Sequence, residues 1–126
     1  MNLNAVTYAI NGAIFAVHST LGAGFLEKVY ENALMIELKN RSLDAENQVP
    51  LTVQYQGQPV GEYFADIVVN NQVILEIKAV IRIDKIHEAQ LLNYLKASGF
   101  QVGLLVNFNA VKADIRRFVM TPDNSI

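Results

Sequence analysis

Apolar residues recur every three or four positions in three separate parts of the chain, and this spacing is typical of helices that bury one face. The pattern predicts helices at about residues 3–21, 25–41 and 85–98. Glycine follows the first segment at position 22 and the last at position 99, where it commonly ends a helix. Three amphipathic helices are therefore expected.

The same spacing gives each of the last two helices an expected core face. In the second helix this face is expected to contain Leu26, Val29, Ala33, Leu34, Ile36 and Leu38. In the third helix it is expected to contain Ile86, Ala89, Leu92 and Leu95, with Leu91 beside it.

Elsewhere the pattern changes to that of strands, at residues 44–56, through a hairpin at 63–79, and at 115–120. A continuous apolar run at residues 100–108 predicts a strand that is buried on both faces. Because a helix leads into this run, we expect it to pair in parallel. The predicted fold class is α/β (α+β), a mixed central β-sheet flanked by helices. Its order is α-α-β-β-β-α-β-β, in one domain over residues 1–126.

Three charged side chains interrupt the apolar central hairpin: Asp66, Glu76 and Lys78. Glu76 and Lys78 are two positions apart, so they share one face of their strand. Asp66 joins that face only if the turn has the right length. A two-residue loop at Asn70-Asn71 would point Asp66 to the other face, whereas a three-residue loop would pair it with Glu76. We therefore predict the longer loop, or a bulge with the same effect.

Two carboxylates side by side repel each other, so one takes up a proton or both bind a cation. Mg²⁺ (or Mn²⁺) suits such a pair because it takes oxygen ligands, keeps several waters and accepts phosphate oxygens. Lys78 would then orient the attacking water or stabilise negative charge that develops at phosphorus. The alternative interpretation is an ion pair on a solvated face, because so short a pattern also arises by chance.

Two of the helices carry polar stripes. His87, Gln90 and Tyr94 share one side of the third helix, which faces either water or the strand carboxylates. Gln and Tyr form hydrogen bonds without charge, so they would orient a water, a phosphate or a lysine. In the second helix, Glu27 shares a stripe with Glu31. Alone, Glu27 indicates a solvated carboxylate at a helix start.

A basic cluster, Lys112, Arg116 and Arg117, lies near the end of the chain. It is a candidate contact for a phosphate backbone, and a solvated surface is the alternative. From Met120 onward the sequence predicts a loose tail.

Composition limits the classes of function. The chain has 126 residues and no cysteine, so it has no disulfides and no zinc–thiolate site. Its net charge of −2 disfavours nucleic-acid binding by bulk charge. A zinc hydrolase is disfavoured because His18 and His87 are widely separated. No apolar run reaches the ~20 residues of a membrane span. The first basic residue is Lys28, so a signal peptide is not indicated and we expect a cytoplasmic protein without membrane contact.

Several separate segments, in this order, resemble the PD-(D/E)XK nuclease superfamily and, more narrowly, its GxxExxY family. The name pattern of that family matches Gly24 to Tyr30 (G-F-L-E-K-V-Y). The similarity continues through I-L-E-I-K, E-A-Q-L-L-N-Y-L and G-L-L-V-N-F-N. Ala65 stands where the superfamily name has proline, a position that varies widely. The resemblance implies a restriction-endonuclease-like core.

The resemblance also implies roles for individual residues. The implied metal ligands are Asp66, Glu76, the Ile77 carbonyl and Glu27, the last as an extra carboxylate from a helix. The implied catalytic residues are Lys78, Glu76, Asp66, Gln90 and Tyr94, of which the last two match a Q-x3-Y element of exonuclease-like branches.

These features predict a nuclease that depends on Mg²⁺ or Mn²⁺ and hydrolyses phosphodiester bonds of nucleic acid, DNA rather than RNA. Because no separate recognition domain is evident, sequence specificity is expected to be low unless a homodimer or another partner supplies it. The alternative, from a different class, is a catalytically silent module with the nuclease fold that binds or regulates. A site that binds no divalent ion would favour this alternative.

Overall fold

The computed structural model describes residues 2–120, so most of the tail predicted from Met120 onward lies outside the described residues. Within this part of the chain the helices and strands follow the predicted order α-α-β-β-β-α-β-β. The elements are α1 (Leu3–Leu21), α2 (Glu27–Asn40), β1 (Ala45–Tyr55), β2 (Gln58–Val69), β3 (Val73–Lys78), α3 (Lys85–Ser98), β4 (Val102–Asn107) and β5 (Asp114–Val119).

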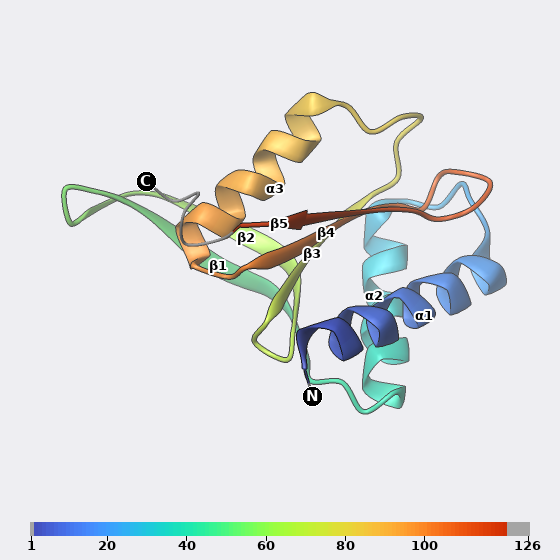
Figure 1. Cartoon of the computed structure of the whole chain (residues 1–126). Helices are drawn as coiled ribbons and strands as arrows, with labels where there is room; N and C mark the ends of the chain where they lie inside the picture. Colours follow the sequence, from blue (N-terminus) through green and yellow to red (C-terminus); the bar gives the residue numbers. More distant parts are fainter. Residues whose placement is uncertain (1, 121–126) are drawn as a thin grey trace.

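The five strands form one mixed sheet in the order β1-β2-β3-β4-β5. β3 and β4 are parallel, as the intervening helix α3 requires, and all other neighbouring pairs are antiparallel. Figure 1 shows α1 and α2 together on one face of the sheet and α3 on the other face. The sheet is thus the middle layer of an α+β fold of the restriction-endonuclease type, as predicted.

Each face of the sheet has its own core. The larger core joins α1 and α2 to alternate residues of the central strands, such as Ile67, Leu75 and Ile77. The smaller core joins α3 to the residues between them, such as Val68 and Ile74. Because successive strand residues point to opposite faces, Glu76 and Lys78 share the face that α3 covers.

The predicted core face of α2 is partly wrong. Tyr30, Leu34 and Leu38 are fully buried and face the sheet at a spacing of four residues. Leu26, Val29 and Ile36 are instead 80%, 39% and 64% exposed. The prediction mixed two neighbouring apolar stripes of one helix, and the tyrosine that it left out determines which stripe faces inward.

The predicted core face of α3 needs a similar correction. Leu95 is buried as expected, and so are Leu91, beside the predicted face, and Tyr94. Ile86, Ala89 and Leu92 are instead exposed, Ile86 at 72%. The buried face is therefore turned toward the side that carries Tyr94. Asp84 caps the start of the helix and Gly99, in the left-handed conformation, ends it, both as the sequence indicates.

Within residues 2–120, no helix combines the length and the apolar character needed to cross a membrane.

Candidate functional site

The turn between β2 and β3 has the length that the sequence predicts. Val69 pairs with Val73, so three residues form the loop, and the Gln72 N–H donates to the Val69 carbonyl at 2.9 Å. Asn70 and Asn71 both adopt the left-handed backbone conformation, which Asn tolerates better than most residues. This register brings Asp66 opposite Glu76.

At Asp66 and Glu76 the ladder between β2 and β3 changes character. The last regular pair is Ile67 with Leu75, and beyond it side chains take the place of backbone partners. The Asp66 N–H donates to Glu76 Oε1 at 3.2 Å, and the Ile77 N–H donates to Asp66 Oδ2 at 2.8 Å. Each carboxylate therefore reaches across to the opposite strand, and the two groups meet where the strands open.

Burial disfavours ionisation of both carboxyl groups of this pair. The Glu76 side chain is almost completely buried, and burial together with the charge of Asp66 raises its pKa to about 8. Burial also raises the pKa of Asp66, against the stabilising hydrogen bond from Ile77. At neutral pH the pair therefore retains a proton unless a cation compensates the second negative charge.

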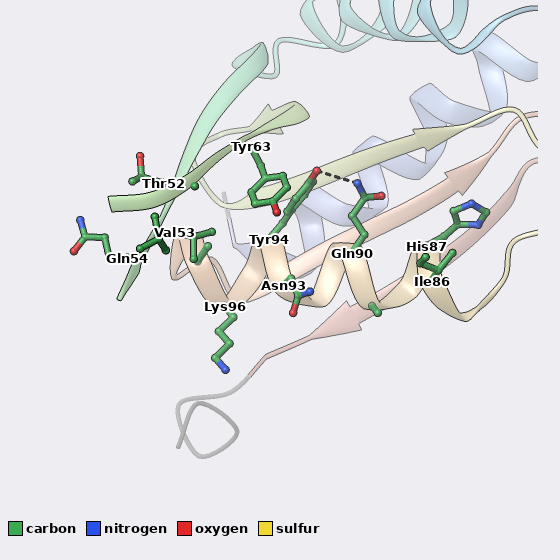
Figure 2. Close-up of a pocket in the computed structure, with 14 residues that line it drawn as sticks. Thr52, Val53, Gln54, Tyr63, Ile86, His87, Gln90, Asn93, Tyr94 and Lys96 are labelled. Carbon is green, nitrogen blue, oxygen red and sulfur yellow. Dashed lines mark hydrogen bonds between the residues drawn. The ribbon is translucent and has the colours of Figure 1, made fainter. Parts of the chain in front are cut away.

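Lys78 lies on the same face as Glu76 and is held by the polar stripe of α3. Its Nζ donates to Gln90 Oε1 at 3.2 Å, and Gln90 Nε2 donates to the Tyr94 hydroxyl at 3.0 Å. The Gln90–Tyr94 bond is drawn in Figure 2. Burial and the nearby charge of Glu76 raise the pKa of Tyr94, so its hydroxyl stays protonated. The three side chains form a chain of hydrogen bonds from β3 to α3.

His87, the third member of the α3 stripe, has a different role. Its Nδ1 accepts a hydrogen bond from the Asp84 N–H at 3.1 Å, and the Asp84 carboxylate caps the same helix end. His87 therefore belongs to the start of α3 and is not part of the chain that leads to Lys78.

Helix α2 presents a carboxylate near Asp66, but at Glu31. Glu27 is exposed at the first position of the helix. Glu31 is 4% exposed, and its negative charge contributes to the raised pKa of Asp66. Sequence reasoning placed both residues on one stripe and selected Glu27. The local pattern contains no signal that Glu31 is buried, since two of its three hydrogen-bond partners come from β1.

Those partners hold Glu31 firmly. Lys28 Nζ donates to Glu31 Oε2 at 2.9 Å, Gln48 Nε2 donates to Oε1 at 3.0 Å, and Asn47 Nδ2 donates to Oε2 at 3.3 Å. Gln48 adopts the left-handed conformation, and the β1–β2 pairing skips it opposite Asp66. Backbone strain of this kind persists only where its surroundings fix it, often near functional sites.

Two further residues of the family pattern, Gly24 and Tyr30, stabilise the loop before α2. The Tyr30 ring stacks on Phe108 with ring centres 4.5 Å apart, and its hydroxyl donates to the Gly22 carbonyl at 2.6 Å. Gly24 has φ +109°, a conformation that favours glycine. These residues position α2, and through it Glu31.

Asn107 is a further residue that sequence reasoning missed. It is buried opposite Lys78 in the β3–β4 ladder, and its side chain exchanges two hydrogen bonds with the backbone of Val80. It thereby fixes the path of the chain directly after Lys78. An asparagine at the end of an apolar run was the available signal.

The predicted basic cluster does not form one surface. Arg116 forms ion pairs with Glu88 and Asp114, whereas Arg117 donates to Asn4 of α1. Neighbouring strand residues point to opposite faces, so the two arginines are separated by the sheet.

The donor set suits a Mg²⁺ or Mn²⁺ ion that keeps several water ligands. Asp66 and Glu76 supply carboxylate oxygens, and burial together with the charge of Asp66 raises the pKa of Glu76, so a cation between them would favour the ionised pair. The Ile77 N–H faces Asp66, and the carbonyl of a strand residue points to the same side as its N–H. Within residues 2–120, no three His, Cys, Asp or Glu side chains are grouped to hold an ion by themselves. A site with two carboxylates, a carbonyl and waters is consistent with this.

Comparison with known proteins addresses the fold and the family. No curated protein matches the chain. Among solved structures, the chain is similar to the one described as the crystal structure of SSO0001, with 23% sequence identity and a TM-score of 0.59. The match covers 78% of this chain but only 52% of that protein, so the chain spans about half its length. At this identity the likeness shows a shared fold.

A family model described as the PD-(D/E)XK nuclease superfamily matches residues 4–118. The matched segment includes the paired carboxylates, Lys78, strands β1 to β4 and all but the last residue of β5. Because the match covers nearly the whole chain, the protein belongs to the PD-(D/E)XK nuclease superfamily.

Proposed function

We propose that the protein is a metal-dependent nuclease that hydrolyses phosphodiester bonds in DNA, and that it belongs to the GxxExxY family within its superfamily. The observation that carries this proposal is the meeting of Asp66 and Glu76 where β2 and β3 open, beside Lys78. A buried carboxylate pair costs free energy in a fold that has no use for it. A divalent cation gives the pair a function.

Asp66, Glu76 and the Ile77 carbonyl would hold a Mg²⁺ or Mn²⁺ ion. When bound, such an ion neutralises negative charge on the scissile phosphate and favours formation of the nucleophile. The protein contributes a buried, shaped site with pre-positioned oxygen atoms. Loss of the shared proton from the Asp66–Glu76 pair prepares both carboxylates to bind the cation.

Lys78 would stabilise the negative charge that develops on the phosphate oxygens, or orient the attacking water. Gln90 accepts one hydrogen of the Lys78 ammonium, which leaves the others free to point at the substrate. Tyr94 fixes the amide of Gln90 in turn. The role of Gln90 and Tyr94 is therefore to position Lys78.

Glu31 is our candidate for the contribution of α2, acting on the metal site through water or through its charge. Its burial, its three hydrogen-bond donors and its effect on Asp66 support this assignment. The role that the resemblance implies for Glu27 stays a separate prediction, which a matched pair of variants can test.

The experiment is cleavage of labelled DNA by the purified chain with Mg²⁺, with Mn²⁺ and with a chelator. We expect cleavage only with a divalent ion, and a loss of roughly 10²–10³-fold in Lys78→Ala and in Asp66→Asn. Lys39→Ala, which changes an exposed lysine at the end of α2, is the matched control and should retain wild-type activity.

Full activity in Lys78→Ala and Asp66→Asn would contradict the mechanism. If the wild-type chain neither cleaves DNA nor binds a divalent ion, the silent binding or regulatory module becomes the better account.

A further inference from the structure

A groove lies beside the site, between α3 and the outer half of the β1–β2 hairpin. β2 pairs with β3 only from Ile67 to Val69, whereas it pairs with β1 from Gln58 onward. The part of the β1–β2 hairpin that precedes Ile67 in β2 therefore extends past the rest of the sheet. The groove has a volume of about 1080 Å³. Its polar and aromatic lining residues include Thr52, Gln54, Tyr63, Gln90, Asn93 and Tyr94, all labelled in Figure 2. Val53, Val60 and Ile86 add apolar surface.

The groove and the candidate site share two side chains. Gln90 and Tyr94 line the groove, and Gln90 also accepts the hydrogen bond from Lys78. A molecule in the groove therefore contacts the residues that position Lys78. This continuity makes the groove a path for the substrate toward the carboxylates.

The chemistry of the lining favours nucleic-acid bases over a phosphate backbone. Among the residues of 2–120 that line the groove, Lys96 is the one Lys or Arg, and none is Asp or Glu. A protein that grips a duplex by its phosphates needs several cations. Amide and hydroxyl side chains with aromatic rings are instead suited to unpaired bases, which stack on rings and form hydrogen bonds along their edges.

Tyr63 offers the accessible ring for such stacking. It is 50% exposed and lies 5.7 Å, between ring centres, from Tyr94, which is buried and fixed by Gln90. Figure 2 shows the Tyr63 ring beside Tyr94 at the groove wall. The ring is thus supported on one side and open on the other.

From this arrangement we propose that the groove binds an unpaired DNA strand, with a base stacked on Tyr63, and that single-stranded DNA is the preferred substrate. This proposal rests on the proposed nuclease function for its catalytic part. Its binding part stands by itself, because the groove residues other than Gln90 and Tyr94 lie outside the metal site.

The test is fluorescence anisotropy without divalent ions, using a labelled single strand of about 12 nucleotides and a blunt duplex of the same sequence. We expect the single strand to bind at least roughly tenfold more tightly than the duplex. Tyr63→Ala should weaken binding of the single strand by roughly tenfold, while Tyr63→Phe, which keeps the ring, should bind like the wild type. Tyr8→Ala is the matched control, since Tyr8 is 81% exposed on α1, across the sheet.

A second variant fills the groove without removing a contact. A Cβ at Gly61, which lines the groove, would meet the Tyr63 ring edge at 3.8 Å, an ordinary contact, so the backbone accepts a side chain there and Gly61→Leu adds bulk at the groove wall. It should also weaken single-strand binding by roughly tenfold, with an unchanged melting temperature as evidence of folding. Equal binding of single strand and duplex, or wild-type binding by Tyr63→Ala and Gly61→Leu, would overturn the proposal.

Cleavage of the same two substrates with Mn²⁺ separates this proposal from the proposed function. Equal cleavage of duplex and single strand would contradict the single-strand proposal for the groove and leave the proposed nuclease function in place. Absence of cleavage together with Tyr63-dependent binding would contradict the nuclease function and support single-strand binding in the groove.

Discussion

Two adjacent residues of β3 point to opposite faces of the sheet, one into an apolar core and the other into the candidate site. Leu75 points to the face covered by α1 and α2 and is fully buried among apolar side chains. Glu76, the next residue, points to the α3 face and is almost equally buried, but its neighbours are Asp66, Lys78 and the polar stripe of α3. One short strand therefore serves a dry core with one set of side chains and a charged site with the other.

The difference shows how a small domain can bear the cost of a buried charge cluster. Two helices cover one face and only one covers the other, so the apolar contacts concentrate on the first. On the second face, β2 and β3 can therefore separate, and polar side chains can lie beside α3. Substitutions on the two faces should accordingly change stability in opposite directions.

The largest change is expected on the apolar face. Leu75→Ala removes a fully buried side chain and should lower the free energy of unfolding by roughly 2–5 kcal/mol, measured by urea denaturation. Ile36→Ala is the control, because Ile36 is 64% exposed on α2 and its loss should cost less than about 0.5 kcal/mol. Equal losses in the two variants would mean that the inward face of α2 and the core of β3 are assigned wrongly.

On the polar face, Glu76→Gln should stabilise the metal-free protein at high pH. The pKa of Glu76 is raised from 4.5 to about 8 in the folded state, so unfolding releases a proton between these values. The wild-type protein therefore loses stability as pH rises through this window, by a few kcal/mol in total, and Gln has no such loss. The two proteins should be equally stable near pH 4 and differ most near pH 9. A constant difference across this range would contradict the buried pair.

The smallest change distinguishes Glu31 from Glu27, two of the carboxylates of α2. Glu31→Gln should weaken Mn²⁺ binding or slow DNA cleavage by roughly tenfold, because Glu31 is buried near Asp66. Glu27→Gln should stay close to the wild type, because Glu27 is exposed. Thermal unfolding of both variants controls for a purely structural effect. A larger effect from Glu27 would restore the role that the family resemblance implies.

Local signals were sufficient to predict the order of the elements and the central hairpin. Asp84 and Gly99 mark the two ends of α3, and Asn70 and Asn71 tolerate the left-handed turn that brings Asp66 opposite Glu76. These features depend on residues close together in the sequence, so the pattern contains them.

Features that depend on tertiary contacts were missed or mistaken. The inward face of α2 is determined by Tyr30, which stacks on Phe108 far away in the sequence. Glu31 is held by Asn47 and Gln48 of β1, and no spacing within α2 indicates that contact. The groove likewise forms only because the β1–β2 hairpin extends past β3 toward α3.

The central claim is that Asp66 and Glu76 form one divalent-metal site, and calorimetric titration with Mn²⁺ tests it most directly. We predict one bound ion per chain in the wild type, with release of a proton because Glu76 retains one in the metal-free state, and no binding in Asp66→Asn. No binding to the wild type at millimolar Mn²⁺, or unchanged affinity in Asp66→Asn, would contradict the account.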